Sequence, residues 1–364
     1  MENKKLAATS TDFAALGLKP TNIPEVWEDG MRTTGEKGNL EWWYFDTHLD
    51  DGTIIVATYS TKNPASANIG LKPFISLVIT RADGSVIKKE LEYEKEDFSA
   101  SKEKCDVKIG KNYFRGNLEK YEIHFEDDEL VMDINIERTS ESWRPKTGHT
   151  YFGEEKQLFF AWVVAVPQGK AQVTFTYNGE KYSGKGSCYH DHNWGNVSME
   201  KMFNHWYWSR AQLGPYTIIA VEMIAEKKYN HDSVMSFYLS KDGKTIADDA
   251  DYVKLYRSFS KLDEASGKDI SDDLVFIYEN PNDEYRYEYF LHKERFIDNF
   301  SLVKTVTGDG MKYYLAKFIS GFDGYYFRFS GRVELLVFKG KELVDKQESK
   351  VAVWELMYFG KPNQ

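Results

Sequence analysis

Residues 41–60 read EWWYFDTHLDDGTIIVATYS. An aromatic run from Glu41 to Leu49 and a β-branched run from Thr53 to Ser60 flank the turn Asp50-Asp51-Gly52. Successive side chains of a strand point to opposite faces, and two such runs joined by a glycine turn are typical of a β-hairpin. This stretch predicts that the fold is built from antiparallel strands.

Runs of the same kind recur along the chain, with Gly, Asp or Asn turns between several of them. We expect further strands at residues 74–80, 121–125, 130–136, 157–166 and 171–177, and a second set at 205–213, 216–225, 234–239, 274–278, 285–293, 312–319, 325–329, 332–338 and 351–358. The 3.6-residue period of helices is hard to find over any long window. Many strands at this spacing predict an all-β sandwich or barrel.

The length of the chain predicts two domains. Its 364 residues exceed the roughly 250 to 300 residues at which a single core usually stops growing. We place the boundary near residue 200, which gives domains at 1–199 and 200–364. Both begin with a tryptophan-rich strand, Trp42-Trp43-Tyr44 and Trp206-Tyr207-Trp208. Aromatic clustering alone does not establish an internal repeat.

Composition narrows the classes of partner that fit. The chain carries a formal net charge of -10, is 41% hydrophobic and 15% aromatic, and has no long block of Lys and Arg. This charge argues against a nucleic-acid surface and disfavours anionic membranes. The aromatic side chains can line a pocket as well as fill a core, so an apolar small molecule is the expected partner. The sequence leaves the oligomeric state open.

The sequence also predicts a cytoplasmic location. The first ten residues lack the apolar run of about 7 to 15 residues of a signal peptide. No apolar stretch approaches the ~18 to 20 residues of a membrane span. Cys105 and Cys188 are the two cysteines, and they lie too far apart to suggest a disulfide framework. We expect reduced thiols and no stable insertion into a membrane.

Residues 188–195, CYHDHNWG, bring together two imidazoles, a carboxylate, an amide and an indole. Histidine titrates near neutral pH, aspartate can orient it or transfer a proton, and an indole face can hold an apolar or cationic group. The same residue types are common where a strand ends in a turn. The mixture nevertheless favours a functional site.

The histidine pair also raises the question of a metal. On a strand His190 and His192 share a face, so they could bind zinc together if a third ligand came from elsewhere. Asp191 and Asn193 would face the opposite way. No second ligand cluster with recognisable spacing is present, so we predict neither a metal nor any other cofactor.

These motifs carry a resemblance to a known family. Residues 38–45 (GNLEWWYF), the turn Asp51-Gly52 and residues 189–195 together resemble the carotenoid 1,2-hydratase (hydroxyneurosporene synthase) and AttH-like family. The resemblance implies two lipocalin-like (calycin) β-barrels in tandem, with both motifs in the first. It also implies addition of water to a carbon-carbon double bond of a long apolar isoprenoid, without a redox cofactor. Relatives of this fold include secondary-metabolite cyclases that catalyse Diels–Alder closures.

The resemblance places the functional histidine and tryptophan of a His-Asn-Trp string on His192 and Trp194. A further Tyr-x-Asp element expected on a downstream strand is not evident, and its nearest equivalent is Ala220-Val221-Glu222. This departure replaces a tyrosine and lengthens the acid. It bears directly on carotenoid hydration, since that element belongs to the hydratase pattern.

Hydration of an unactivated alkene requires a proton donor in an apolar setting. Glu222 has apolar neighbours in both strand phases, so desolvation would raise its pKa. The alternative is an ion pair between Glu222 and Arg210 on the adjoining strand. Asp191 is the competing acid, but two flanking histidines would lower its pKa and suit it to orienting a histidine.

The aromatic residues divide by strand face. Trp42 and Tyr44 share a face with Asp46, which predicts a polar pocket wall, whereas Trp43 and Phe45 face the other way and predict packing. Trp206 and Trp208 share a face with Arg210, either as a pocket wall or as an exterior stack. Core filling remains the ordinary role of any single aromatic side chain.

The sequence therefore favours a cofactor-independent hydratase or hydro-lyase that acts on an isoprenoid or polyene by acid catalysis. A cofactor-free, Diels–Alderase-like cyclase or isomerase of secondary metabolism and a non-catalytic carrier of a hydrophobic ligand are the alternatives. The predicted catalytic residues are His192, Asp191, Glu222 and Trp194. The predicted substrate-binding residues are His190, Asn193, Tyr189, Trp42, Tyr44, Trp206 and Trp208.

Overall fold

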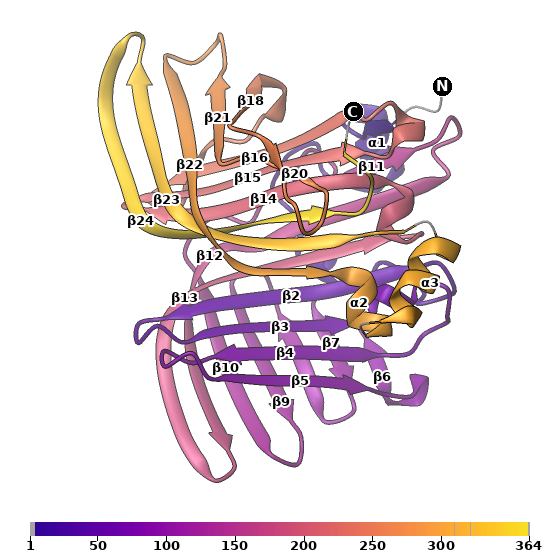
Figure 1. Cartoon of the computed structure of the whole chain (residues 1–364). Coiled ribbons are helices and arrows are strands. Elements are labelled where there is room, and N and C mark those ends of the chain that lie inside the picture. The colour runs from indigo at the N-terminus through magenta and orange to yellow at the C-terminus, as the bar shows by residue number, and fades with distance from the viewer. Residues whose placement is uncertain (1–3, 309, 321, 363–364) are drawn as a thin grey trace. The chain divides into compact units, whose positions relative to one another are not determined.

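A computed structural model describes residues 4–308, 310–320 and 322–362 (Figure 1). Its contacts divide the chain into two compact units, one formed by Lys5–Ser198 and the other beginning at Met199. Each unit is a large, curled antiparallel sheet with few helices. The all-β class predicted from the alternating runs is therefore confirmed.

The N-terminal unit contains a sheet of thirteen strands. Its main path runs β5-β4-β3-β2-β13-β12-β10-β9-β8-β7-β6, and β11 pairs with β12 and β1 off this path. The strands are β1 (Lys4–Leu6), β2 (Leu40–Leu49), β3 (Ile54–Ser60), β4 (Phe74–Thr80), β5 (Val86–Glu92), β6 (Phe98–Ala100), β7 (Asp106–Ile109), β8 (Asn112–Gly116), β9 (Lys120–Glu126), β10 (Leu130–Arg138), β11 (His149–Phe152), β12 (Leu158–Tyr177) and β13 (Glu180–Gly195). Short helices are α1 (Ser10–Ala15), η1 (Val26–Asp29), η2 (Pro64–Ser66) and η3 (Lys95–Asp97).

The hairpin expected at residues 41–60 consists of β2 and β3. These strands pair antiparallel, with Trp42 opposite Ser60 at one end and His48 opposite Ile54 at the other. Trp43, Phe45 and Leu49 lie in the core of the unit, together with Cys188 from β13. The strand face that carries Trp43 and Phe45 was predicted to pack, and it does lie in the core. Alternation then places Trp42 and Tyr44 on the side of the sheet away from this core.

The C-terminal unit contains a sheet of nine strands in the order β17-β16-β15-β14-β24-β23-β22-β21-β18. The strands are β14 (Phe203–Leu213), β15 (Tyr216–Ala225), β16 (Ser233–Lys241), β17 (Lys244–Ala247), β18 (Val253–Ser258), β21 (Asp273–Glu279), β22 (Tyr285–Ser301), β23 (Tyr325–Lys339) and β24 (Glu342–Tyr358); β19 (Lys261–Leu262) and β20 (Asp269–Ile270) pair separately. Helices are η4 (Met199–Lys201), η5 (Lys227–Tyr229), η6 (Ala250–Tyr252), α2 (Leu302–Thr307) and α3 (Met311–Ser320). Aromatic residues such as Tyr207, Phe329 and Trp354 fill the core.

One predicted strand is wrong. Residues 312–319 lie in α3, which follows α2 between the long strands β22 and β23 (Figure 1). Met311, Tyr314, Leu315 and Phe318 recur at the helical spacing i, i+3, i+4 and i+7, and leucine and lysine are good helix formers. The short run of aromatic residues was ambiguous between the two periods, and the helical period prevails.

Several strands are also longer than predicted. The runs at 157–166 and 171–177 form one strand, β12, and those at 325–329 and 332–338 form β23. Irregular pairing next to Gly169 and Gly331 lets both strands continue where the sequence suggests a break. Among the described residues, no helix is both long and apolar enough to cross a membrane.

Candidate active site

Strand β13 presents the HDHNWG motif on two opposite faces. It lies between β2 and β12, with His192 paired to Trp43 and Val163, and Asn193 paired to Trp42 and Trp162. His190 and His192 therefore point toward the barrel core, whereas Asp191 and Asn193 point away from it. The run stays extended, so the predicted separation of the histidines from Asp191 and Asn193 is confirmed.

The side of the sheet away from the core carries a cluster that we name the Asp191 face. It consists of Trp42 and Tyr44 on β2, Trp162 on β12, and Tyr189, Asp191 and Asn193 on β13. Directly opposed residues of antiparallel strands share a face, so three adjacent strands place these side chains together. All six except Trp162 were predicted as site residues from the sequence.

Three side chains hold the Asp191 carboxyl group. Trp162 Nε1 and Tyr189 Oη donate hydrogen bonds to Asp191 Oδ2 over 2.8 and 2.7 Å, and Asn193 Nδ2 donates to Oδ1 over 2.7 Å. Asp191 is almost fully buried. Desolvation raises its pKa, because this burial outweighs the hydrogen bonds and the charge of His190.

The predicted lowering of the Asp191 pKa by two flanking histidines is therefore wrong. Alternation along β13 places both imidazoles on the opposite face of the sheet. There His190 contacts Asp29 and His192 contacts Glu41. His190 still lowers the pKa of Asp191, but desolvation of the buried carboxyl group, which the local charge argument left out, has the larger effect.

Further aromatic rings lie on the Asp191 face. The Tyr44 and Tyr189 rings lie 6.2 Å apart, and the Trp42 ring lies 6.2 Å from that of Phe160. Tyr44 Oη also donates to Asp46 Oδ2 over 3.3 Å. Trp42 and Tyr44 are half-buried. Trp162 and Tyr189 are buried. This face thus combines a few fixed polar groups with two partly exposed aromatic side chains, which suits an apolar substrate carrying a polar group.

His192 occupies a sealed position on the core face. His192 Nε2 lies 2.9 Å from Glu41 Oε1, and both side chains are fully buried. Glu41 Oε2 also accepts hydrogen bonds from the Thr33 backbone amide and hydroxyl group, at 2.8 and 2.6 Å. The Trp43 ring stacks on His192 with a centroid distance of 4.5 Å. Every polar atom of this imidazole side chain is engaged by the protein itself.

Trp194 also belongs to the core face. Its ring lies 4.8 Å from that of His192 and meets His149 edge to face at 5.4 Å. It packs with Ala161 and Val163 in a small buried cluster. Trp194 is therefore a packing residue on the core face of the motif.

His190 contacts a segment that sequence reasoning missed. His190 Nε2 lies 3.3 Å from Asp29 Oδ2, and Asp29 ends helix η1. The preceding residue, Glu28, forms a fully buried ion pair with Arg144 at 2.6 Å. These partners lie more than 100 residues from the residues they contact, and each is a single charged residue in an unremarkable local pattern. No signal in the local sequence singles them out as partners of the motif.

Glu222 lies in the other unit from the motif. Its strand, β15, is buried along its whole length, as its apolar neighbours predicted. Its carboxylate accepts a hydrogen bond from Ser233 Oγ at 3.0 Å and pairs with Arg257 of β18. The predicted partner, Arg210, is wrong, because the β14–β15 register puts Glu222 opposite Tyr207 and Arg210 opposite Ile219, on opposite faces.

Trp206 and Trp208 also lie in the C-terminal unit and share one face of β14. Trp206 Nε1 donates to Glu355 Oε1 over 3.4 Å, and its ring packs against Phe203 and Phe359. Of the predicted site residues, the structure thus gathers one group on the Asp191 face, a second on the core face of β13, and a third on β14 and β15.

The chain matches a protein-family model over more than half of its length. The model described as Diels-Alderase-like matches residues 27–258, well over half of the chain. The chain belongs to the Diels-Alderase-like family. The match covers both β13, which carries the Asp191 face, and the first strands of the C-terminal unit.

This Diels-Alderase-like protein is similar to several solved structures. CghA aligns with a TM-score of 0.62 and 11% identity over 95% of this chain and 98% of that one. The AttH-like protein NE1406 of Nitrosomonas europaea gives 0.55 and 12% over 93% and 97%. Kievitone hydratase of Nectria haematococca gives 0.54 and 13% over 98% and 96%. These matches confirm the predicted double-calycin fold.

A curated relative matches more narrowly. The quinolone epoxide rearrangement protein penF of Penicillium thymicola is 36% identical over 55 residues. That segment is 15% of this chain and 15% of penF. The match therefore extends over only a small part of either sequence.

Proposed function

We propose that this protein is a cofactor-free cyclase or isomerase of secondary metabolism that rearranges an apolar, polyene-like substrate on the Asp191 face. The observation that carries the proposal is the Asp191 carboxyl group, fixed by three donors on the same face of the sheet as Trp42 and Tyr44. The aromatic rings hold the apolar part of the substrate in a folded shape. The fixed polar group sets the orientation of a substrate oxygen.

Such a site accelerates a reaction mainly by positioning. Holding reacting carbons in an attack geometry can supply about 7–11 kcal/mol of the barrier, without a redox group or a metal in the reaction itself. A rearrangement or ring closure of this kind keeps all atoms of the substrate, so no co-reactant is needed. Membership of the Diels-Alderase-like family and the segment shared with penF support this class of reaction.

Hydration of a carbon-carbon double bond is the second candidate. The buried Asp191 carboxyl group within an aromatic wall is the arrangement that proton delivery to an alkene requires, and kievitone hydratase shares the fold. In this version Asp191, rather than Glu222, is the proton donor, and the ring of Trp42 shelters the cation. An isoprenoid such as a carotenoid belongs to this second candidate.

Substitutions on the Asp191 face distinguish the two reactions. Extract from host cells that lack the gene supplies the accumulated substrate, and product formation is followed for purified variants. We expect Trp42→Ala and Tyr44→Ala to lower kcat/KM by about 100-fold, because a misplacement of about 1 Å can cost that much. Asp191→Asn keeps the shape of the side chain and should cost less than either.

The control is Tyr113→Ala. Tyr113 is also a half-buried tyrosine on a strand of the same unit, and it stacks on His124 far along the sheet order from β2. It should leave kcat/KM near the wild-type value. If Asp191→Asn instead removes about 10²- to 10⁴-fold and the aromatic variants remain active, acid catalysis and hence hydration replace the proposal.

A further inference from the structure

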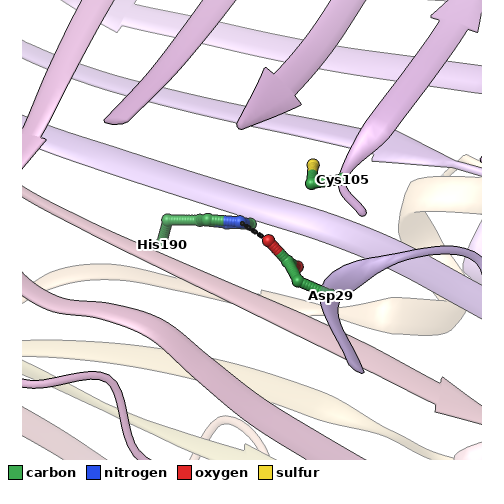
Figure 2. A group of neighbouring side chains, drawn as sticks. All are labelled: Asp29, Cys105 and His190. Carbon is green, nitrogen blue, oxygen red and sulfur yellow. Dashed lines mark hydrogen bonds and ion pairs between the residues drawn. The ribbon is translucent and has the colours of Figure 1, made fainter. Parts of the chain in front are cut away.

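The core face of β13 carries a second cluster with different chemistry. Asp29, Cys105 and His190 are all buried, and one ligand atom from each lies within 4.8 Å of the others. Figure 2 shows His190 and Asp29 pointing at each other, with Cys105 nearby. The three residues come from η1, from the segment just before β7, and from β13. Three distant parts of the chain thus meet at one point.

The backbone contact of His190 Nδ1 turns Nε2 toward Asp29, with Nε2 at 3.3 Å from Asp29 Oδ2. His190 Nδ1 lies 2.8 Å from the Tyr44 backbone carbonyl oxygen, which can only accept, so Nδ1 carries a proton. Metal-bound histidines commonly use a backbone carbonyl in this way to fix the ring and its tautomer. In the neutral ring, Nε2 then faces the Asp29 carboxylate, and two acceptors would oppose each other.

A proton shared between His190 and Asp29 would ordinarily remove this repulsion. The His192–Glu41 pair shows the short distance that such a hydrogen bond has. His192 Nε2 lies 2.9 Å from Glu41, the length of a charge-assisted hydrogen bond. His190 Nε2 lies 3.3 Å from Asp29 Oδ2. That separation is long for an ion pair, but it is the distance between two ligands at the corners of a tetrahedron with bonds of about 2.0–2.1 Å.

The second carboxylate oxygen of Asp29 also supports a metal site. Asp29 Oδ1 is buried and has no hydrogen-bond partner, and His192 Nδ1 is 3.6 Å away. Leaving a buried carboxylate oxygen unsatisfied is costly. Tyr121 Oη donates to Oδ2 over 2.5 Å and fixes the carboxylate in place. The Cys105 thiol has a weak contact with the Phe114 carbonyl oxygen at 3.5 Å.

We propose that Asp29, Cys105 and His190 bind one zinc-type divalent ion inside the N-terminal unit. A thiolate, an imidazole and a carboxylate form a ligand set that zinc accepts, with a fourth position left for a further ligand. On binding, the thiol proton of Cys105 and any proton between His190 and Asp29 leave, and three metal–ligand bonds form. The ion ties η1 and the start of β7 to β13. It is independent of the reaction proposed for the Asp191 face.

Cobalt provides the probe, since it replaces zinc in such sites and reports thiolate ligation by a charge-transfer band. The full chain is produced without a metal-affinity tag in medium supplemented with Co²⁺, and the purified protein is assayed for metal content and absorption. We expect about one cobalt ion per chain and the thiolate band. Cys105→Ser should lose the band and most of the metal.

Cys188→Ser is the matched control, because Cys188 is the other cysteine, is equally buried in the same core, and is not in the cluster. It should keep both signals. Wild-type protein without bound cobalt or zinc, or a band that persists in Cys105→Ser, overturns the proposal. The wild-type metal content decides the matter even if Cys105→Ser does not fold.

Discussion

Replacing His192 with alanine is expected to lower the free energy of unfolding by about 3–5 kcal/mol, because it removes the imidazole that pairs with the buried Glu41 carboxylate. Both side chains are fully buried and 2.9 Å apart. Turnover per folded molecule should stay near the wild-type value, since His192 faces away from the Asp191 face. Chemical denaturation and kcat normalised to the folded fraction measure the two effects.

The pair His124–Asp133 is the matched control. Its Nδ1–Oδ1 distance is 2.7 Å, but Asp133 is 53% exposed, so solvent screens the interaction. His124→Ala should cost less than about 1 kcal/mol. A His192 variant that remains as stable as His124→Ala but loses turnover would show that His192 is catalytic, as the family resemblance first implied.

Acid should destabilise the fold through His149. Desolvation by burial lowers the pKa of His149 from 6.5 to about 4 and outweighs the hydrogen bond to the Thr147 backbone carbonyl oxygen, which raises it. Between these values the unfolded chain binds the proton and the folded chain does not, so stability is full above about pH 6.5 and falls as the pH drops toward about 4. The loss from this residue approaches 3 kcal/mol at about 1.4 kcal/mol per pKa unit.

His149→Gln isolates that contribution. The variant lacks the buried imidazole, so the difference in unfolding free energy between wild type and variant should shrink by about 3 kcal/mol from about pH 7 to about pH 4. Other titrating groups cancel in the difference. A difference that stays constant with pH contradicts the account of His149 as a histidine kept neutral by burial.

Strand alternation explains how much of the site the sequence could predict. The period of two in residues 41–49 separates Trp43 and Phe45, which pack, from Trp42 and Tyr44, which line the Asp191 face. The same period separates Asp191 from His190. These assignments need only an extended backbone, so local sequence sufficed.

Long-range partners explain what the sequence could not predict. Asp29 contacts His190 of the motif, and Arg144 pairs with Glu28, through contacts that span more than 100 residues. No local pattern distinguishes these residues from other charged residues. Arg257, which takes the place predicted for Arg210, lies 35 residues from Glu222 and is equally indistinct in the local sequence. The strand predicted at residues 312–319 was wrong for a different reason. A short aromatic run fits both the strand period and the helix period.

The mass of the product tests the central claim most directly. Dialysed protein, without added cofactor, is incubated with extract from cells that lack the gene, and substrate and product are compared by liquid chromatography and mass spectrometry. A cyclase or isomerase gives a product with the mass of its substrate, and Trp42→Ala and Tyr44→Ala should abolish most of it. A product heavier by one water, or a ligand that is bound without being changed, would contradict the account.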